Sequence, residues 1–258
     1  MKRWLKALAA RAGYAVLRTR GRYWQDGLFT LHGARFRAEA RFRAAYARGV
    51  AASQGHDPEF EWRIHVALWA ARLASHVPGD FVECGVNAGF VSSAIAEDLG
   101  WPVAGKRFHL VDTFAGPVAE QYSREEIAKG RLDIARDALA AGAYVTDAAR
   151  VRAQFAAWPG VVVVQGAVPG VLSALDVDAV AFLHLDMNCA FPEVAALEYF
   201  WPRLQPGGVV LLDDYAYFGH EHQGDAIDAA ARKLDASVLA LPTGQGLIVK
   251  ARRRAATS

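Results

Sequence analysis

Five short runs of apolar and β-branched residues, each ending at or next to a glycine or an aspartate, constrain the fold of this chain more than any other feature. They occupy residues 81–85, 107–111, 161–165, 179–185 and 209–213. Helical patterns follow three of them, at residues 89–99, 191–203 and 222–234. Because nearly continuous Val, Leu and Phe indicates strands covered on both faces, and strands that alternate with helices form parallel sheets, we expect a doubly wound α/β fold.

The flanking segments complete this picture. Residues 34–52 and 60–77 are rich in alanine, lack proline and carry aromatic residues at helical spacing, so each is predicted to be a helix. Residues 237–242 and 246–250 are predicted to form an antiparallel hairpin at the sheet edge. We therefore predict a mostly parallel seven-stranded sheet. The predicted boundaries are a helical extension over the active site at 1–78 and a ligand-binding domain at 79–258.

Charge is distributed unevenly along the chain. Residues 1–48 contain twelve Lys and Arg and two acidic residues, which leaves 17 basic and 25 acidic residues elsewhere. Residues 1–20 are expected to form a basic helix with Trp4, Leu5 and Leu8 on one face, which is typical of peripheral membrane contact. A solvated helix without a lipid partner is the alternative. The two cysteines lie in apolar runs, which favours free thiols and a cytoplasmic location.

The first motif that indicates chemistry follows the first predicted strand. It reads Glu83-Cys84-Gly85-Val86-Asn87-Ala88-Gly89. Ligands of open α/β sheets bind beyond the carboxyl ends of the strands, and Gly85 and Gly89 let the backbone approach a ligand closely. The spacing is not the G-x-G-x-x-G of dinucleotide folds, so a pyrophosphate site is poorly supported. The alternative is a tight turn without a ligand.

A carboxylate follows the second predicted strand, in Val111-Asp112-Thr113. An acidic side chain at this position accepts hydrogen bonds from the two hydroxyls of a ribose. A helix cap is the alternative role for Asp112 and Thr113. The two motifs together predict a nucleoside-containing cofactor.

Three aspartates end the last two parallel strands. Asp186 follows residues 179–185, Asp213 ends residues 209–213, and Asp214 follows directly. Converging carboxylates repel one another unless they are protonated or neutralised, and Mg²⁺ would neutralise them. We expect a metal site that lowers the pKa of a substrate hydroxyl. One functional acid, with the other side chains capping loops, is the alternative.

Two histidines, His220 and His222, follow the acidic pair. Since histidine titrates near neutral pH, either one could act as a general base. Histidines at the start of a helix are also common as plain surface residues.

These residues together resemble the macrocin (TylF-type) O-methyltransferases, a group of class I S-adenosylmethionine-dependent enzymes with a Rossmann-like fold. The resemblance is carried by five segments: Val82 to Gly85, Asp112 to Gly116, Leu185-Asp186, Pro202 to Gly208, and Asp213 to Tyr215. It implies that Glu83, Gly85 and Asp112, with Asn87, Gly89, Thr113 and Asp186 beside them, bind S-adenosylmethionine. It also implies that Asp186, Asp213 and Asp214 hold Mg²⁺ and that the acceptor is a hydroxylated sugar.

One position departs from the family pattern. The family commonly carries a second aspartate two residues after the metal-binding one, thought to be the general base, and this chain has Asn188 there. Asparagine does not accept a proton at neutral pH. Either His220 or His222 serves instead, or the metal alone acidifies the hydroxyl, or the reaction has been lost or changed.

The sequence therefore predicts transfer of a methyl group from S-adenosylmethionine to an oxygen of a sugar or a glycosylated small molecule. A non-catalytic S-adenosylmethionine-binding partner in glycan or secondary-metabolite assembly is the main alternative, which Asn188 favours. A nicotinamide-dependent oxidoreductase is disfavoured by the glycine spacing. No nucleic-acid partner is expected, because residues 49–258 are net acidic. The oligomeric state is left open, a homo-oligomer included.

Overall fold

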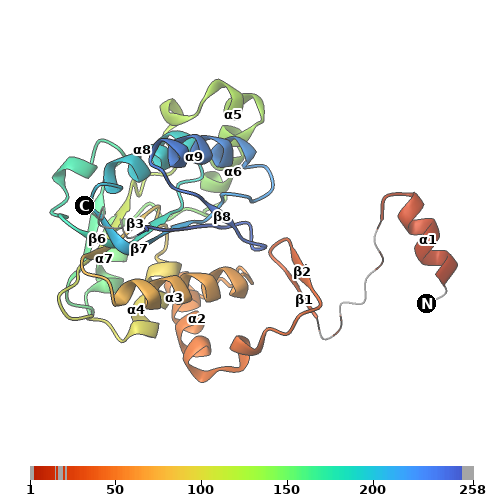
Figure 1. Ribbon diagram of the computed structural model, residues 1–258, viewed down its shortest axis with the longest axis horizontal. Helices are drawn as coiled ribbons and strands as arrows, with labels where there is room; N and C mark the ends of the chain where they lie inside the picture. Colours follow the sequence, from red (N-terminus) through yellow and green to blue (C-terminus); the bar gives the residue numbers. More distant parts are fainter. Residues whose placement is uncertain (1–2, 15, 17–19, 21, 252–258) are drawn as a thin grey trace, which may run out of the picture.

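The computed structural model describes residues 3–14, 16, 20 and 22–251, and Figure 1 shows their arrangement. Its centre is a seven-stranded sheet in the order β5-β4-β3-β6-β7-β9-β8. The strands are β3 (Asp80–Cys84), β4 (Phe108–Asp112), β5 (Val161–Gln165), β6 (Val180–Leu185), β7 (Leu204–Leu212), β8 (Leu239–Ala240) and β9 (Gly246–Val249). The strands from β5 to β7 in this order are parallel, and β9 is antiparallel to β7 and β8. The predicted doubly wound, mostly parallel sheet is confirmed.

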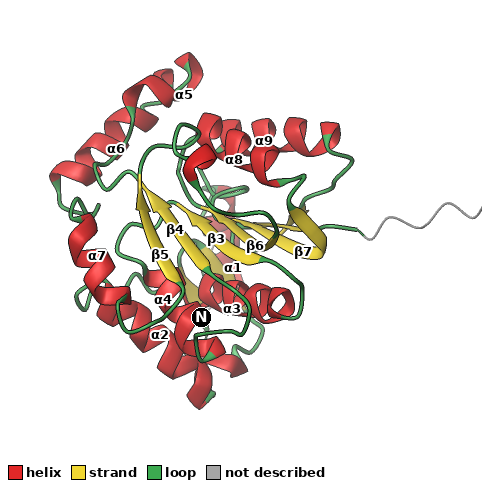
Figure 2. Cartoon of the chain, turned by 90° about the vertical axis from the view of Figure 1, so that its left-hand side faces the viewer, coloured by secondary structure: helices red, strands yellow, loops and turns green. Residues whose placement is uncertain are grey.

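Helices cover both faces of the sheet (Figure 2). One face packs against α2 (Ala40–Ala52), α3 (Glu61–Ser75), α4 (Phe90–Leu99) and α7 (Ala148–Phe155). The other packs against α8 (Ala190–Phe200) and α9 (Glu221–Lys233), and α5 (Arg124–Ala128) and α6 (Arg131–Ala140) lie near its edge. Since successive strand side chains point to opposite faces, Phe81 belongs to the first core and Val82 to the second.

The two N-terminal helices differ in detail from the prediction. Residues 34–52 form a short 3₁₀ helix, η1 (Arg35–Ala38), and then α2, because Glu39 between them has an extended backbone with ψ 130°. The predicted helix 60–77 is α3. Phe36, Phe42 and Ile64 from this region share one hydrophobic core with Phe81 and Phe182 of the sheet. Residues 34–75 therefore pack as part of the same body as the sheet.

Two further differences from the prediction concern the start of a strand and several elements that the sequence patterns did not place. The strand predicted at 209–213 begins at Leu204, because Pro206, Gly207 and Gly208 are accommodated where the pairing of β6 and β7 shifts register. Two short 3₁₀ helices, η2 (Ala119–Gln121) and η3 (Leu172–Ala174), and the helices α5, α6 and α7 were not placed by the sequence patterns. The predicted C-terminal hairpin is present as β8 and β9, with β9 inserted beside β7.

The N-terminal region adds a second hairpin and a separate helix. Strands β1 (Tyr23–Gln25) and β2 (Leu28–Thr30) pair through the two-residue turn Asp26-Gly27, a turn signature that the sequence patterns above did not use. Helix α1 (Arg3–Arg11) is drawn apart from the rest of the molecule in Figure 1. The helix predicted over residues 1–20 is too long: α1 ends at Arg11, before Gly13 with its positive φ of 79°, and residues 12–14, 16 and 20 are not helical. The other residues of this range after Arg11 lie outside the described part of the chain. None of the described helices has the length and apolar character that a bilayer span requires.

Candidate functional site

The predicted acidic and glycine-rich motifs meet at the carboxyl ends of the parallel strands. The chain passes outward from β3 to β4 and β5, and then returns to build β6 and β7 on the other side of β3. Ligands of doubly wound folds bind at this reversal of strand order. Two cavities open there.

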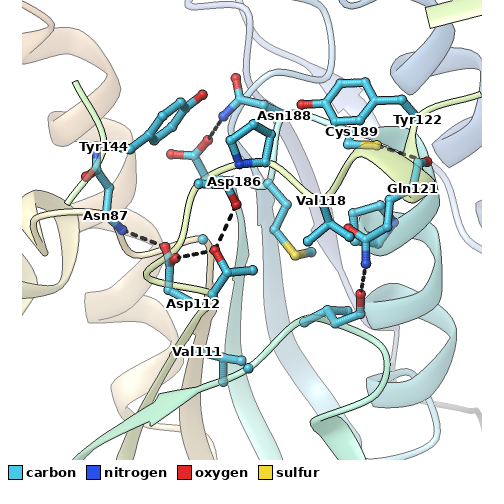
Figure 3. Close-up of a pocket in the computed structure, with 18 of the residues that line it drawn as sticks. Asn87, Val111, Asp112, Val118, Gln121, Tyr122, Tyr144, Asp186, Asn188 and Cys189 are labelled. Atoms are coloured by element: carbon cyan, nitrogen blue, oxygen red, sulfur yellow. Dashed lines mark hydrogen bonds between the residues drawn. The ribbon is translucent and has the colours of Figure 1, made fainter. Parts of the chain in front are cut away.

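The first cavity, here called the β4-side cavity, occupies about 830 Å³ with its open mouth included. It is lined by the loops after β4, β5 and β6, and the residues used below are Asp112, Thr113, Tyr122, Tyr144 and Asn188 (Figure 3). The second, the α3-side cavity, occupies about 810 Å³ on the same measure and is lined by residues of 53–67, Glu83 and Asp213. Gly85, Asn87 and Asp186 line both, so the two cavities are halves of one continuous site.

Gly85 and Gly89, the two glycines of the first motif, are required for different steric reasons. Gly85 has a φ of 89°, and a Cβ atom there would lie 1.8 Å from the carbonyl oxygen of Asp186. Its glycine requirement therefore comes from the close packing of two strand-end loops, in addition to any ligand. Gly89 also has a positive φ and begins α4, where a Cβ would meet the ring of Phe155 at 2.7 Å. Gly89 lines neither cavity, so the structure gives no support to its predicted contact with the cofactor.

Asp112 links the ends of β3 and β4. Its Oδ2 accepts the backbone N–H groups of Val86 and Asn87 at 2.7 and 2.8 Å, and its Oδ1 accepts that of Phe114 at 2.8 Å. The hydroxyl of Thr113 donates to the carbonyl oxygen of Gly116 at 2.9 Å, which shapes the next turn. A carboxylate has about four acceptor positions, so Asp112 retains capacity for a ligand hydroxyl at the wall of the β4-side cavity.

Asn87 fixes the loop that forms the rim of the site. Its side-chain amide donates to the carbonyl oxygen of Ala143 at 3.0 Å and accepts the N–H of Val145 at 2.8 Å. This pair of hydrogen bonds places Tyr144 over the shared part of the cavities (Figure 3).

The three predicted metal-binding aspartates do converge, but a cation from the protein lies among them. The guanidinium Nη2 of Arg63, on α3, donates to Asp214 Oδ1 at 2.7 Å and to the carbonyl oxygen of Asp213 at 2.7 Å, and lies 3.2 Å from Asp213 Oδ2. Its Nε lies 3.7 Å from Asp26 Oδ2, in the turn between β1 and β2. The Arg63 guanidinium also stacks over the ring of Tyr217, 4.8 Å from its centroid.

Burial and this cation set the protonation of the cluster. Although burial works in the opposite direction, Arg63 and then His184 lower the pKa of Asp213. Burial, followed by the charge of Asp213, raises the pKa of Asp214. Burial, followed by the charges of Asp213 and Asp214, raises the pKa of Asp186 well above its ordinary value. Among the three carboxyl groups, Asp186 is therefore readily protonated whereas Asp213 stays ionised.

The donor set does not fit the predicted Mg²⁺. Magnesium requires near-octahedral oxygen ligands at about 2.1 Å. No three or more His, Cys, Asp or Glu side chains in the described part of the chain are grouped so that they could hold a metal ion. One carboxylate oxygen each of Asp213 and Asp214 contacts Arg63, and the other oxygen of Asp213, Oδ1, accepts from the Gln245 amide at 2.9 Å. We derive no step of the reaction through a metal.

Glu83 and His184 form a buried pair beneath the cluster. His184 Nδ1 lies 3.0 Å from Glu83 Oε1, and its Nε2 lies 3.7 Å from Asp213 Oδ1. Although burial disfavours protonation, the carboxylates of Asp213 and Glu83 raise the pKa of His184 to about 10. His184 is thus a buried structural cation. The second oxygen of Glu83, Oε2, is buried without a hydrogen-bond partner, and Glu83 lines the α3-side cavity.

The residues considered for the general base lie at different places. Asn188 lines the β4-side cavity, and its amide donates to Asp186 Oδ1 at 3.1 Å, so it orients that carboxylate (Figure 3). His220 is buried, with Nδ1 3.0 Å from Gln223 Oε1 and 3.7 Å from Asp214 Oδ2, and lines neither cavity. His222 contacts Ser123 and Glu125 in a separate groove on the side of α8 and α9.

Arg63 is the functional residue that the sequence patterns missed. It lies inside a predicted helix among apolar and aromatic neighbours, where no motif marks it. Its apolar neighbours in the sequence were a clue, because they place it on a face of the helix that is expected to be buried. An arginine on such a face requires an anionic partner. Tyr144 was missed because it lies in a loop that carries no motif.

Comparisons with known proteins agree with this geometry. A family model described as a methyltransferase domain matches residues 82–215, which extend from β3 to the loop after β7. No curated protein matches the chain significantly.

Solved structures match the fold over most of the chain. The structure of the O-methyltransferase NovP matches with a TM-score of 0.60 and 21% identity, over 74% of this chain and 80% of that one. A crystal structure of CalS11, a calicheamicin methyltransferase, matches with a TM-score of 0.52 and 16% identity, over 85% and 98% of the two chains. An apo structure of CalS11, described as a TDP-rhamnose 3′-O-methyltransferase, matches with a TM-score of 0.50 and 18% identity, over 72% and 77%. At these identities the likeness establishes the fold.

Proposed function

The chain belongs to the methyltransferase domain family and is an S-adenosylmethionine-dependent methyltransferase, and we propose that it methylates an oxygen of a sugar or of a glycosylated small molecule. One observation carries the proposal. The two cavities meet over Gly85 and Asp186, with Asp112 in one and Glu83 in the other. An elongated cofactor with a ribose and an ammonium group matches this pair of carboxylates.

In this proposal the cofactor extends across both cavities. Asp112, whose carboxylate is already oriented by Val86 and Asn87, would accept a hydrogen bond from one ribose hydroxyl. Its ammonium group lies toward Glu83, where the unpartnered Oε2 would gain a donor. Asp186, which lines both cavities, and Asn188, which contacts it, would then border the methyl group that the cofactor supplies.

Asp186 receives the proton of the acceptor hydroxyl in the proposed reaction. The hydroxyl oxygen attacks the methyl carbon, the bond from that carbon to sulfur breaks, and S-adenosylhomocysteine leaves as the neutral thioether. Asp186 is suited to this role because it borders both cavities and because burial raises its pKa, which makes it a stronger base than an exposed carboxylate. Asn188 orients it, and positioning of the two reactants supplies much of the rate.

Two observations support a sugar-type acceptor. The sequence resembles the macrocin (TylF-type) O-methyltransferases in the segments quoted above, and CalS11 is described as acting on TDP-rhamnose. The polar side chains of Tyr122, Tyr144 and Asn188 around the β4-side cavity could bind the hydroxyls of such a molecule. Magnesium assistance is not part of the proposal, because Arg63 occupies the centre of the carboxylate cluster.

The N-terminal region is proposed to bound the site. Ser53, Phe60 and Arg63 all line the α3-side cavity, which supports the expectation that residues 1–78 cover the active site. A cytoplasmic location and peripheral membrane contact through residues 1–20 are part of the same proposal.

The first experiment is calorimetric titration of S-adenosylmethionine, S-adenosylhomocysteine and, separately, NADH into the purified chain. We expect the first two to bind and NADH not to bind. Turnover is then measured as S-adenosylhomocysteine release with nucleotide-activated sugars and simple glycosides. The variant Asp186→Asn should retain cofactor affinity and lose activity by about 100-fold or more, since general base catalysis contributes about that much. Binding of NADH without S-adenosylmethionine would overturn the proposal.

A non-catalytic S-adenosylmethionine-binding protein is the second candidate, because Asn188 occupies the position where the family's base is usual. Single-turnover conversion of bound cofactor in the presence of the acceptor panel separates the two. If cofactor binds with a normal affinity and no acceptor is methylated under single-turnover conditions, the non-catalytic role is favoured.

A further inference from the structure

Arg63 is a buried cation at the point where the acidic side chains of the site face one another. Only 11% of its side chain is exposed. Its guanidinium contacts Asp213 and Asp214 on one side and faces Asp26 on another, and Tyr217 stacks over it. Four elements of the fold thereby meet at one guanidinium: α3, the turn of the β1–β2 hairpin, the end of β7 and the loop after it.

The position of this cation is itself fixed by further contacts. The Tyr217 hydroxyl donates to Asp26 Oδ1 at 3.1 Å, so the ring that covers Arg63 is held by one of the same carboxylates. Gln245 donates to the remaining oxygen of Asp213 at 2.9 Å. Because both oxygens of Asp213 already have donors, a metal ion could bind Asp213 only by displacing Arg63 or Gln245.

The charge of arginine suits such a permanent role. A guanidinium stays protonated at any physiological pH and matches carboxylates in fixed geometry, whereas a divalent ion exchanges with solvent and depends on its concentration. A second cation close to the guanidinium would be repelled strongly at a site with little water.

We propose that Arg63 is the resident cation of this carboxylate cluster and takes the place of a divalent metal, so that the site assembles and binds its cofactor without one. The statement about cofactor binding rests on the proposed function. The prediction about metal binding concerns the cluster alone and is tested without turnover.

The test is Mn²⁺ binding to the purified full-length chain, followed by the electron paramagnetic resonance signal of free Mn²⁺. The native chain is expected to bind no stoichiometric Mn²⁺ at this site. The variant Arg63→Met, which keeps an unbranched apolar side chain and removes the guanidinium charge, is expected to bind one ion at least about tenfold more tightly, because the freed carboxylates have lost their cation. The variant Arg63→Lys keeps the charge and should behave as the native chain.

Arg72 provides a matched control on the same helix. It also binds a buried aspartate, Asp98, at 2.7 Å, but Asp98 keeps a second arginine partner, Arg41, at 2.9 Å. Arg72→Met should therefore disturb the fold of α3 comparably and create no Mn²⁺ site. Circular dichroism establishes that each variant is folded.

The results decide the proposal in either direction. It is overturned if the native chain binds one Mn²⁺ and loses it in Asp213→Asn, or if folded Arg63→Met binds Mn²⁺ no better than the native chain. Should Arg63→Met fail to fold, the native chain and Arg63→Lys still decide it. Titration of S-adenosylhomocysteine with and without EDTA gives a separate readout. Equal affinity supports the proposal, a large loss in EDTA contradicts it, and no binding in either buffer refutes the proposed function instead.

Discussion

At the scale of single residues, Asp112 shows how one side chain can serve both the fold and the ligand. Its carboxylate accepts the N–H groups of Val86 and Asn87, which hold the turn after β3, and that of Phe114 after β4. The sequence indicated a carboxylate beside the glycine-rich turn. It did not indicate these hydrogen bonds, because they depend on the register between two strands and join residues as far as 26 positions apart in the sequence.

The variant Asp112→Asn is expected to weaken cofactor binding. In either orientation, an amide would place its NH₂ group against at least one backbone N–H donor and would lose a charged acceptor for the ribose. The dissociation constant for S-adenosylhomocysteine should rise about 10- to 100-fold, as for the loss of a charge-assisted hydrogen bond. Isothermal titration calorimetry measures this. Asp176→Asn, at an exposed carboxylate outside both cavities, is the control and should leave the constant unchanged.

His184 gives the folded chain a pH dependence whose sign follows from its pKa. Although burial opposes protonation, Asp213 and Glu83 raise this pKa from 6.5 to about 10. The folded chain therefore holds a proton that the unfolded chain releases between these two values. The contribution of His184 to stability is complete below pH 6.5 and is lost as the pH rises toward 10.

We accordingly expect the free energy of unfolding, measured by urea titration, to fall between pH 7 and pH 9. The slope from this one group is at most about 1.4 kcal/mol per pH unit. The variant His184→Gln should flatten the decline, whereas His65→Gln should preserve it, because burial lowers the pKa of His65 and it is neutral throughout this range. An unchanged slope in His184→Gln would show that other groups cause the decline.

At the scale of elements, the periodicity of apolar residues predicted the type and order of the helices and strands better than their boundaries. The parallel strands were recognised because burial on both faces makes them continuously apolar, as in β6, where every residue is buried. The break at Glu39 was not recognised, because residues 34–52 have one continuous helical composition and only packing against the core separates η1 from α2. Loop residues 117–158 contained three helices whose caps, such as Ser123 and Asp147, had not been used as signals.

Helix α5 depends on a capping box that also anchors it to α8. Ser123 and Glu126 exchange the two hydrogen bonds of the box, and the second oxygen of Glu126 accepts the N–H of Ala190 at 3.0 Å, at the start of α8. Glu126 is buried, so no water would replace it easily. One side chain therefore joins two helix N-termini beside the β4-side cavity.

Removal of this side chain should lower the stability of the whole chain. Glu126→Ala leaves the buried N–H group of Ala190 and the partly buried one of Ser123 without these acceptors, and we expect a loss of about 2 kcal/mol or more in the free energy of unfolding. Glu120→Ala, at an exposed glutamate four residues from α5, should change it by less than about 0.5 kcal/mol. Equal values for the two variants in urea titration would contradict this role.

At the scale of the whole molecule, the sequence supplied most acidic side chains of the site but not the cation that organises them. Asp112, Asp186 and Asp213 follow strands whose parallel arrangement could be predicted, so their convergence could be predicted as well. Arg63 and Asp26 come from the N-terminal region, and nothing in the local sequence shows that they lie within reach of β7. The Mg²⁺ site was expected because three carboxylates were predicted to converge and no cation of the protein was known to lie beside them.

The distribution of charge over the molecule leads to a last prediction, about where the enzyme works. The acidic body carries a basic N-terminal segment, and Trp4 and Leu8 of α1 are each 60% exposed. Apolar side chains beside basic ones bind the interface of anionic membranes, and the attraction weakens with salt. We expect the full chain to co-sediment with vesicles that contain phosphatidylserine, in a fraction that falls as ionic strength rises.

A matched pair of variants distinguishes membrane binding by α1 from nonspecific adsorption of exposed apolar side chains to the vesicles. Trp24 and Leu31, outside α1, are exposed to 60% and 62%, nearly the same as Trp4 and Leu8. The double variant Trp4→Ala/Leu8→Ala should lose most of the vesicle binding, and Trp24→Ala/Leu31→Ala should keep it. If the native chain stays in the supernatant at low salt, α1 is a solvated basic helix. If both double variants lose binding equally, the contact involves more of the N-terminal region than α1 and is not specific to its apolar face.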